Sequence, residues 1–475
     1  MMRSLYSGVS GLKVHQTKMD VIGNNIANVN TIGFKASTVQ FSDVFYQTTQ
    51  SASGANELTG MAGMNAKQIG LGTTLSSISA AMSTQGGAQR TDNATDIMIT
   101  GNAFFVVNNG SGNYFTKNGS FTIDGTGHLA TENGYYVMGW SPDPSDPNKI
   151  KQDSVGKIAI QTPENATTPP EATTDVTLKG NIDKTDSKLT GTDGYIISSE
   201  FYDNLGNAYT AKIKLEKDTS VNTKGENQYK MTLAGITDKD GNAVTSELMT
   251  GVSFGGDDYT IAADGTITGT GKSAVVKFDA NTGAFISTST GTADAPINTL
   301  DMKITAASDT TANTLFGDKG VIKYDLSSIT QYSTTGACSI SSSKGSLENT
   351  GAGKKVGNLA GISIQPDGKI FGSYDNGTSK LLGQIAVATF SNPSGLESIG
   401  GSLFAATQNS GEFDGKGVDV TADGGKFSTG VLEMSNVDLS SEFTNMITTQ
   451  RGFQASSRII TTSDTLLEEL INLKR

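Results

Sequence analysis

The chain has 475 residues, which corresponds to about three domains of ordinary size. Its 35 basic and 47 acidic side chains give a formal net charge of −12, and this balance argues against a protein that binds nucleic acid or anionic membranes. A single cysteine, Cys338, excludes an internal disulfide framework and a cysteine-rich zinc site. Two histidines, His15 and His128, leave little material for metal binding or acid–base catalysis, so we expect no metal, no cofactor and no catalytic residue.

The sequence carries no membrane or secretion signal that we recognise. No run approaches the ~20 apolar residues that a membrane-spanning helix needs. Residues 1–8 lack the apolar stretch of about 7–15 residues that defines a secretory signal. We therefore expect a protein that stays in the cytoplasm or leaves it by a route without a cleaved signal.

The first 30 residues carry a helical pattern. Apolar residues recur seven positions apart, or on neighbouring positions of the same stripe, at Leu5, Val9, Leu12, Met19, Ile22 and Ile26. This period near 3.5 predicts a helix over most of residues 3–29. Gly8, Gly11 and Gly23 each weaken such a helix by about 1 kcal/mol relative to alanine, so it is expected to be marginal alone.

The C-terminal end has a cleaner pattern, which predicts one long helix over residues 438–473. Asp438 is a suitable N-cap and Glu442 lies in the first turn. The apolar members of its stripe alternate steps of three and four: Leu439, Phe443, Met446, Phe453, Ile460, Leu467 and Ile471. Helices in globular cores usually run about 8–20 residues, so we expect this one to pack against another long helix.

Between the two ends the apolar residues alternate with a period of two, which predicts β-strands. Short strands separated by Asn-Gly and Asp-Gly turns fill residues 97–138, and a similar pattern returns at 362–390. The segment between them is β-rich but more polar, so we interpret the two patterns as one antiparallel domain split by an insertion. The expected division is a terminal helical domain (1–30 and 438–475), an extended connecting segment (31–71), an inner β domain (72–148 and 358–437) and one or two outer β domains (149–357).

Motifs that could carry catalysis or binding are better explained as turns and core residues. Residues 269–273 resemble a phosphate loop, but Thr266 stands where the motif needs glycine, and no helix pattern follows. Residues 238–241 lack the further ligands of a calcium loop, so turn chemistry explains them. Neither histidine has the setting of a catalytic base, and Cys338 and Trp140 are expected to be structural.

Motifs at both ends resemble those of the bacterial flagellar rod and hook proteins. Residues 4–12 (SLYSGVSGL) and 24–35 (NNIANVNTIGFK) resemble the N-terminal signature, and 430–439 (GVLEMSNVDL) with 450–455 (QRGFQA) resemble its C-terminal partner. Glycine at position 452 replaces the asparagine more familiar there. Segments 68–72, 202–208 and 383–390 resemble hook members of the family rather than rod members.

This resemblance implies a mainly β multidomain protein whose paired long N- and C-terminal helices form a coiled-coil-like core on assembly. The implied function is that of a structural subunit of the flagellar hook, a helical homopolymer that transmits torque from rod to filament in flagellum-dependent motility. The implied location is the basal body and hook, outside the cell, after type III flagellar export without a cleaved signal peptide. The implied partners are the chain itself, the distal rod protein, the hook cap protein, the hook–filament junction protein and the export apparatus.

The residues that we expect to form the assembly interface are the apolar members of both helical stripes given above. In the signature of the N-terminal end, four asparagines fit a switch from helix to turn because asparagine tolerates turn geometry. A glycine then permits a sharp bend before an aromatic residue. These motif residues are Asn24, Asn25, Asn28, Asn30, Gly33 and Phe34.

Three other interpretations stay open at the level of sequence. A distal rod-type axial protein would share the end motifs. A secreted β-rich adhesin or glycan-binding protein would explain the polar strands and the acidic balance, but not the paired end helices. A glycosidase remains conceivable only because distances between carboxylates are not set by the sequence.

Overall fold

A computed structural model of the chain describes residues 2–473 except 55–59, 61, 192, 220–225, 289–296, 308–314, 318–319 and 334–335. The chain divides into two compact units. The first contains residues up to Asn165, Gly361–Ser373 and Ser379–Arg475, and the second contains Ala166–Ala360 and Tyr374–Thr378. Residues 149–165 therefore lie in the first unit, not in the outer domain to which the sequence analysis assigned them.

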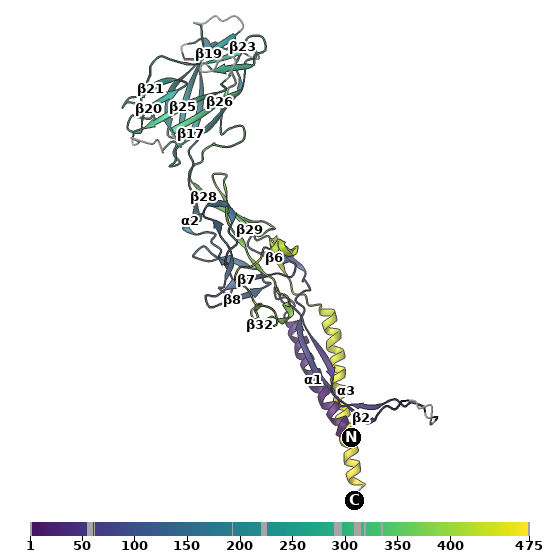
Figure 1. The fold of residues 1–475 in the computed structure, drawn as a ribbon. Coiled ribbons are helices and arrows are strands. Elements are labelled where there is room, and N and C mark those ends of the chain that lie inside the picture. Colours follow the sequence, from purple (N-terminus) through teal and green to yellow (C-terminus); the bar gives the residue numbers. More distant parts are fainter. Residues whose placement is uncertain are drawn as a thin grey trace. The chain divides into compact units, whose positions relative to one another are not determined.

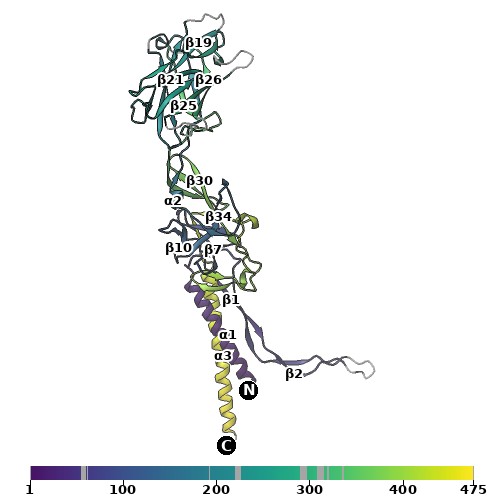
Figure 2. The ribbon, with the colours of Figure 1, turned by 60° about the vertical axis from the view of Figure 1, so that its left-hand side comes forward.

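Two long helices of the first unit lie side by side and run antiparallel (Figures 1 and 2). They are α1 (Met2–Ala27) and α3 (Leu439–Asn472), which confirms both predicted helices to within two residues. The side chain of Asp438 accepts hydrogen bonds from the backbone N–H groups of Ser440 and Ser441, so the predicted N-cap is also confirmed.

Two antiparallel ribbons follow α1 where the sequence predicted only an extended connecting segment. One pairs β1 (Ser37–Asp43) with β4 (Thr73–Ala80), and the other pairs β2 (Tyr46–Gln50) with β3 (Lys67–Gly70). Alternation of β-branched and polar residues satisfies a strand as well as an extended linker, which is why the sequence did not separate the two.

The β-sheet of the first unit combines strands from both sides of the insertion. Its central order is β29-β30-β11-β7-β8-β33-β32, and Gly139 of β11 pairs with Ile385 of β30. Phe105, Phe121 and Val137 lie in its core, and Trp140 is buried as expected. The strands and helices of this unit are β5 (Ala88–Arg90), β6 (Ile97–Thr100), β7 (Phe104–Asn108), β8 (Asn113–Thr116), β9 (Phe121–Ile123), β10 (Leu129–Thr131), β11 (Tyr136–Trp140), β12 (Pro142–Asp143), β13 (Asp146–Ile150), β14 (Gly156–Lys157), α2 (Pro163–Ala166), β29 (Lys369–Tyr374), β30 (Ser379–Ile385), β31 (Val387–Ala388), η3 (Pro393–Gly395), β32 (Glu397–Gly400), β33 (Leu403–Ala405), η4 (Val420–Asp423), β34 (Lys426–Thr429) and β35 (Val431–Glu433).

The second unit consists of two sheets around one hydrophobic core. A seven-stranded sheet has the order β22-β21-β20-β25-β26-β16-β27, and a five-stranded sheet has the order β17-β18-β19-β23-β24. Because buried residues of both sheets belong to one cluster, this unit is a single domain rather than two. Its elements are β15 (Thr167–Thr168), β16 (Asp175–Asn181), η1 (Ser187–Thr190), β17 (Tyr195–Tyr202), β18 (Ala208–Lys217), β19 (Glu226–Asp238), β20 (Met249–Phe254), β21 (Asp257–Ile261), β22 (Ile267–Gly269), β23 (Ala274–Asp279), β24 (Phe285–Thr288), β25 (Thr299–Ala306), β26 (Val321–Thr330), β27 (Ser341–Lys344) and β28 (Gly357–Ile364), the last of which leads back to the first unit.

Candidate assembly surfaces

The two long helices meet at glycines of α1, and we call this contact the seam. A Cβ atom added at Gly8 would lie 3.2 Å from Cγ1 of Ile460. A Cβ atom added at Gly11 would lie 2.9 Å from Oγ of Ser456, and one added at Gly8 would lie 3.3 Å from the backbone oxygen of Ser456. At the far end, Oγ of Ser4 and Oγ of Ser463 are 3.4 Å apart. Gly8 and Gly11 therefore permit the two helices to approach closely. Gly23 has no such role, because a Cβ atom added there would meet nothing within 4 Å.

The residues that α3 buries in the seam are polar. Among the side chains of α3 that the structure describes, Thr449 and Ser463 are the buried ones. The predicted apolar stripe lies beside this line and is left at least partly open. Leu439, Phe443 and Ile471 are exposed, with half of the Phe443 side chain accessible to solvent, and Met446, Phe453, Ile460 and Leu467 are partly buried.

The predicted stripe of α1 is divided in the same way, with one exception. Val9 is exposed, and Leu5, Leu12, Met19 and Ile26 are partly buried. Ile22 is only 3% exposed, so its own chain already covers this side chain. Periodicity finds an apolar stripe but does not say which members the chain itself covers.

Several exposed apolar residues were missed by the sequence analysis. On α3 they lie next to the expected stripe and have heptad-like spacings of their own; on the ribbons they alternate with polar residues. They are Tyr6 on α1; Ile447, Ile459, Leu466 and Leu470 on α3; and Phe41, Phe45, Tyr46, Ile69, Leu75 and Ile78 on or between the ribbons. The apolar surface is therefore wider than one coiled-coil stripe, and it exceeds the isolated apolar residues that are normal on a monomer.

Asparagines of the N-terminal signature act as adaptors between chain segments. Asn25 is buried; its Oδ1 accepts from the N–H of Ser37 at 3.0 Å, and its Nδ2 donates to the carbonyl of Ser37 at 2.9 Å and to Oε1 of Glu442 at 3.3 Å. It thus joins the end of α1, the start of β1 and the first turn of α3. An amide side chain suits this role because it presents one donor and one acceptor edge to a backbone.

Of the other asparagines of the signature, Asn24 lies in the last turn of α1, and Asn28 and Asn30 lie in the turn that follows it. Nδ2 of Asn28 donates to the carbonyl of Asn24 at 2.9 Å, and Oγ1 of Thr31 donates to Oδ1 of Asn28 at 3.0 Å. Asn30 is exposed. The helix ends at Ala27, where this local bonding replaces helical hydrogen bonds.

Gly33 makes the bend that its sequence position predicted. Its φ is +68°, and an added Cβ would lie 2.7 Å from the backbone nitrogen of Asn118. Its N–H donates to the carbonyl of Glu433 at 2.8 Å, and Phe34 follows it, partly buried. Both the left-handed backbone and the close approach require glycine here.

A buried ion pair beside this bend was not foreseen. Nζ of Lys35 lies 2.7 Å from Oε1 of Glu433, and both side chains are almost fully buried. Lys35 also donates to the carbonyl of Thr84 at 2.7 Å, and Glu433 accepts from the N–H of Gly86 at 3.0 Å. Both residues lie inside the two end motifs, but their separation of 398 positions hid the pairing from local pattern analysis.

A second buried lysine lies in the same environment. Nζ of Lys117 donates to the carbonyl of Gly101 at 2.7 Å and lies 5.0 Å from the ring centroid of Phe104. Burial lowers the pKa of Lys117 to about 8, with nearby Glu433 raising it and Lys35 lowering it further.

Asn436 completes the connection between the end motifs. Its Oδ1 accepts from the N–H of Ala36 at 2.7 Å, and its Nδ2 donates to the carbonyls of Ala81 at 3.0 Å and Thr84 at 3.1 Å. We call the set Asn25, Gly33, Lys35, Glu433 and Asn436 the joint, because it ties both ends of the helical pair to the β-strands of the same unit.

The residues that the sequence singled out lie in turns, strands and partly buried positions. Burial raises the pKa of the Cys338 thiol to about 11, which disfavours the reactive thiolate. Asp238 accepts N–H groups from its own turn, and β22 ends at Gly269 and leads to β23 rather than to a helix. Within the described part of the chain, no group of three or more His, Cys, Asp or Glu residues could hold a metal ion, and no helix has the length and hydropathy of a membrane span.

Four protein families match the chain, and between them they cover most of its length. Their descriptions are flagella basal body rod protein (residues 5–35), flagellar hook protein FlgE/F/G D1 domain (98–183), flagellar basal body protein FlaE D2 domain (165–346) and flagellar basal body rod FlgEFG protein C-terminal (428–473).

Whole-chain relatives are also found. The flagellar hook protein FlgE of Borreliella burgdorferi is 34% identical, and that of Treponema pallidum is 33% identical, over all of both chains in each case. The flagellar basal-body rod protein FlgG of Bacillus subtilis is 27% identical, again over all of both chains. The solved structure of Helicobacter pylori flagellar hook protein FlgE2 aligns with 73% of this chain and 100% of that chain, at 15% identity and a TM-score of 0.32.

Proposed function

The chain belongs to the flagellar hook protein FlgE family, and we propose that its copies polymerise through the α1–α3 pair into a flexible curved tube. Relatives with that name match over its full length, so the protein is a structural subunit of the flagellar hook. The family is a structural one, located at the flagellar basal body and hook.

The observation that carries the proposal is the apolar surface that the helical pair leaves open. The side chains that α3 buries are polar, while apolar side chains such as Phe443 and Ile447 are about half exposed. Exposed apolar side chains on a helix are stabilised when a second helix covers them. We infer that neighbouring copies cover this surface and that the coiled-coil-like core forms on assembly.

A contact of this kind produces a polymer rather than a closed dimer when unlike surfaces meet. The outward faces of α1, α3 and the ribbons differ in sequence, so a copy can contact its neighbour head to tail. Repeated head-to-tail contacts whose rotation does not close give an open helical assembly. A hook tube is such an assembly.

Bending of the tube needs subunits that shift without unfolding. Two separately packed units, each with its own core, support rigid-body shifts between copies with little internal strain. In this proposal the helical pairs supply cohesion, and the β units slide against their neighbours as the curved tube transmits torque from rod to filament.

The remaining expectations follow from the same role. The polymer would contact the distal rod protein at one end and the hook cap and hook–filament junction proteins at the other. The subunit would leave the cell through the flagellar type III export apparatus, without a cleaved signal peptide, and would have no enzymatic activity. Within the first unit, the division into a terminal helical domain (1–30 and 438–475) and an inner β domain that reaches Asn165 also stays a proposal.

A distal rod-type subunit is the second candidate, because a rod protein matches over the whole chain at 27% identity. Electron microscopy of the polymerised full chain separates the candidates. A hook subunit should form curved tubes, whereas a rod subunit should form straight ones. A chain that stays monomeric at high concentration and binds a sugar saturably would contradict both and would favour an adhesin.

A further inference from the structure

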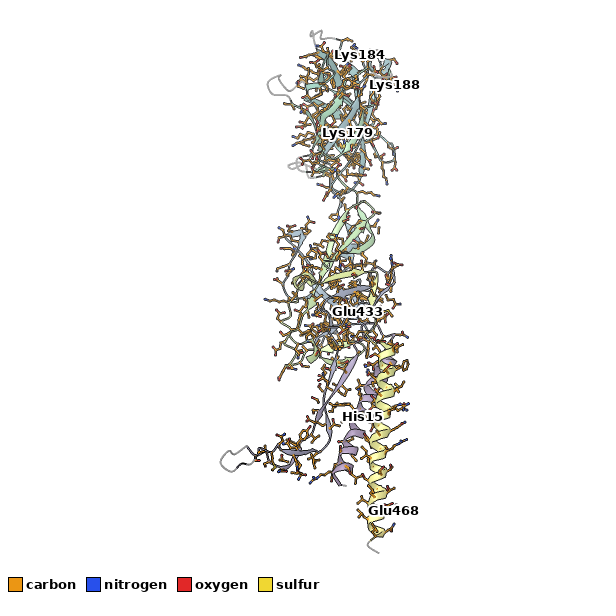
Figure 3. All side chains as sticks on the ribbon, turned by 90° about the vertical axis from the view of Figure 1, so that its right-hand side faces the viewer. His15, Lys179, Lys184, Lys188, Glu433 and Glu468 are labelled. Atoms are coloured by element: carbon orange, nitrogen blue, oxygen red, sulfur yellow. The ribbon has the colours of Figure 1, made fainter. Side chains whose placement is uncertain are left out.

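The imidazole of His15 on α1 enters the seam opposite a glycine of α3. A Cβ atom added at Gly452 of α3 would lie 2.8 Å from both Cε1 and Nε2 of the imidazole and 3.3 Å from Nδ1 (His15 is labelled in Figure 3). Real Cβ atoms do not approach other atoms this closely, so the ring would have to shift to make room for any other residue at 452. The contact is with the far end of the His15 side chain, not with the backbone of α1.

A third element fixes the other side of the imidazole. The ring of Phe41 on β1 lies edge-on to it, with 5.9 Å between ring centroids and an interplanar angle of 90°. Nζ of Lys18 lies 5.6 Å from the same Phe41 ring. His15 is thus a wedge between α3 and the first ribbon, which gives the ring one defined position.

Two kinds of contact line the seam. Those at Gly11, Ser456 and Ser463 are between small residues, which pack similarly after a shift of one turn. Gly8 of α1 instead faces Ile460 of α3, whose Cγ1 would lie 3.2 Å from an added Cβ, and Gly452 of α3 faces His15 of α1. A bulky side chain facing a glycine is different, because a shifted helix would place it against another side chain. We propose that His15 and Gly452 form a knob and a notch that fix the axial register of α1 on α3.

The charge environment of His15 favours the neutral ring. Nδ1 of His15 is buried without a hydrogen-bond partner among the described residues. Lys18 of α1 is the charged group that acts on it, while β1 presents Phe41 and α3 presents Gly452, neither of which carries charge. Burial, followed by Lys18, lowers the pKa of His15 below its ordinary value near 6.5.

The direction of the pH effect follows from that shift. The free ring binds a proton more readily than the ring in the notch, so acid favours the open seam. The contribution of the knob is complete above about pH 6.5 and is lost as the pH falls through the lowered pKa of the paired state.

Cysteine pairs in the full-length chain report the register directly. In a Cys338→Ser background, Ser4→Cys with Ser463→Cys reports the native register, because the two hydroxyl oxygens are 3.4 Å apart. Ser4→Cys with Leu467→Cys reports a slip of about one turn. The fraction of chain that forms the intrachain disulfide at equilibrium, separated by size from chains linked to each other, is the measurement.

Gly452→Ala should lower the ratio of native to slipped disulfide by about fivefold, the size of effect expected for residues in direct contact. His15→Ala should lower the ratio similarly. The double variant should lower it by less than the two single effects combined, because the clash caused by Gly452→Ala disappears when the His15 ring is removed. Gly23→Ala is the matched control and should leave the ratio unchanged, since nothing lies within 4 Å of its added Cβ. His15→Phe should keep the native ratio, because a planar ring of similar size still fills the notch.

A pH series supplies a second measurement that a purely structural role would not change. Helix content, followed by circular dichroism between pH 7.5 and 5, should fall in the parent chain but not in His15→Phe. The proposal is overturned if the native disulfide fails to form in the parent, if Gly452→Ala leaves the ratio unchanged, if the single effects add, or if His15→Phe shows the parent's pH dependence. None of these outcomes bears on whether the chain polymerises, so the proposed function is tested separately.

Discussion

Helix α3 and the second β unit bury opposite kinds of side chain. Strand β25 buries every second residue, and these are Leu300, Met302, Ile304 and Ala306. Helix α3 buries Thr449 and Ser463 and leaves Phe443 half exposed. The β unit therefore covers its apolar residues within one chain, while α3 leaves apolar side chains such as Phe443 exposed for another surface to cover. A strong apolar pattern in the sequence does not show that a segment folds by itself. A segment folds by itself only when other parts of the same chain cover its apolar side chains.

The largest expected effect breaks the helical side of this comparison. Phe443→Asp puts a charge into a surface that we expect neighbouring copies to bury, at a cost of several kcal/mol per contact, so assembly should weaken more than about 100-fold. Sedimentation of polymer from the purified chain measures it. Phe443→Leu, and Thr448→Asp at an exposed polar position of the same helix, should assemble nearly normally. Normal polymerisation of the Phe443→Asp variant would show that α3 does not form the core of the polymer.

A substitution in the core of the second unit should affect that β unit alone. Phe278 is fully buried and contacts the rings of Tyr229 and Phe285, each with 5.8 Å between centroids. Phe278→Ala should destabilise the second unit by about 3–5 kcal/mol and leave assembly intact below its melting temperature. Calorimetry of the full chain tests this, with exposed Ile196→Ala in the same sheet expected to change stability by less than about 0.5 kcal/mol. If Phe278→Ala lost assembly at low temperature, the second unit would be required for formation of the polymer core.

The joint lies between these extremes, and its ion pair should matter to its own unit. Lys35→Met leaves the Glu433 carboxylate buried without its cation and should cost about 3–5 kcal/mol. Trp140, the single tryptophan, is buried in the first unit, so its fluorescence during urea unfolding reports this unit selectively.

The same experiment contains its controls. Arg90→Met breaks the exposed Arg90–Asp92 pair and should cost less than about 1 kcal/mol. Lys35→Met combined with Glu433→Leu removes both charges and should recover part of the loss. If Lys35→Met unfolded like the parent chain, the buried pair would not stabilise the unit.

The bend at Gly33 should show a smaller effect of backbone origin. Gly33→Ala combines a positive φ with a clash against the backbone of Asn118, and we expect a loss of about 2–3 kcal/mol in Trp140-monitored unfolding. Gly134→Ala has a positive φ of 79° but no atom within 4 Å of the new Cβ, so it should cost only about 1–2 kcal/mol. If Gly33→Ala and Gly134→Ala lost equal stability, the close approach of Gly33 to Asn118 would not contribute to the effect.

The smallest effect per step of the experiment is a pH dependence of the first unit, about 1 kcal/mol for each pH unit. Because the pKa of Lys117 falls to about 8 on folding, the unfolded chain holds a proton that the folded chain has released between about pH 8 and 10.4. The free energy of unfolding should therefore rise with pH across this window by about 1 kcal/mol per pH unit. Lowering the pH from about 10.4 removes this gain, and none of it remains once the pH has fallen through about 8. Urea unfolding at several pH values measures it, and Lys117→Met should flatten the slope. A slope that persists in Lys117→Met would assign it to another group.

Much of the local structure follows from the sequence. The apolar period and Asp438 determined both long helices and the start of α3, because helix formation and capping depend on residues within one turn of each other. The bend at Gly33 and the strands of both β units follow from turn chemistry and alternation over a few residues. The end motifs pointed to the family for the same reason, since each is a continuous segment.

Only the tertiary structure decided which faces the chain covers by itself. It buried Ile22, opened Phe443, paired Lys35 with Glu433 across 398 positions, and placed Gly452 against His15. It also moved the boundary between the units to Asn165. These outcomes depend on contacts between residues far apart in the chain, and a periodic pattern fixes the direction of a side chain on its own helix without fixing what stands opposite.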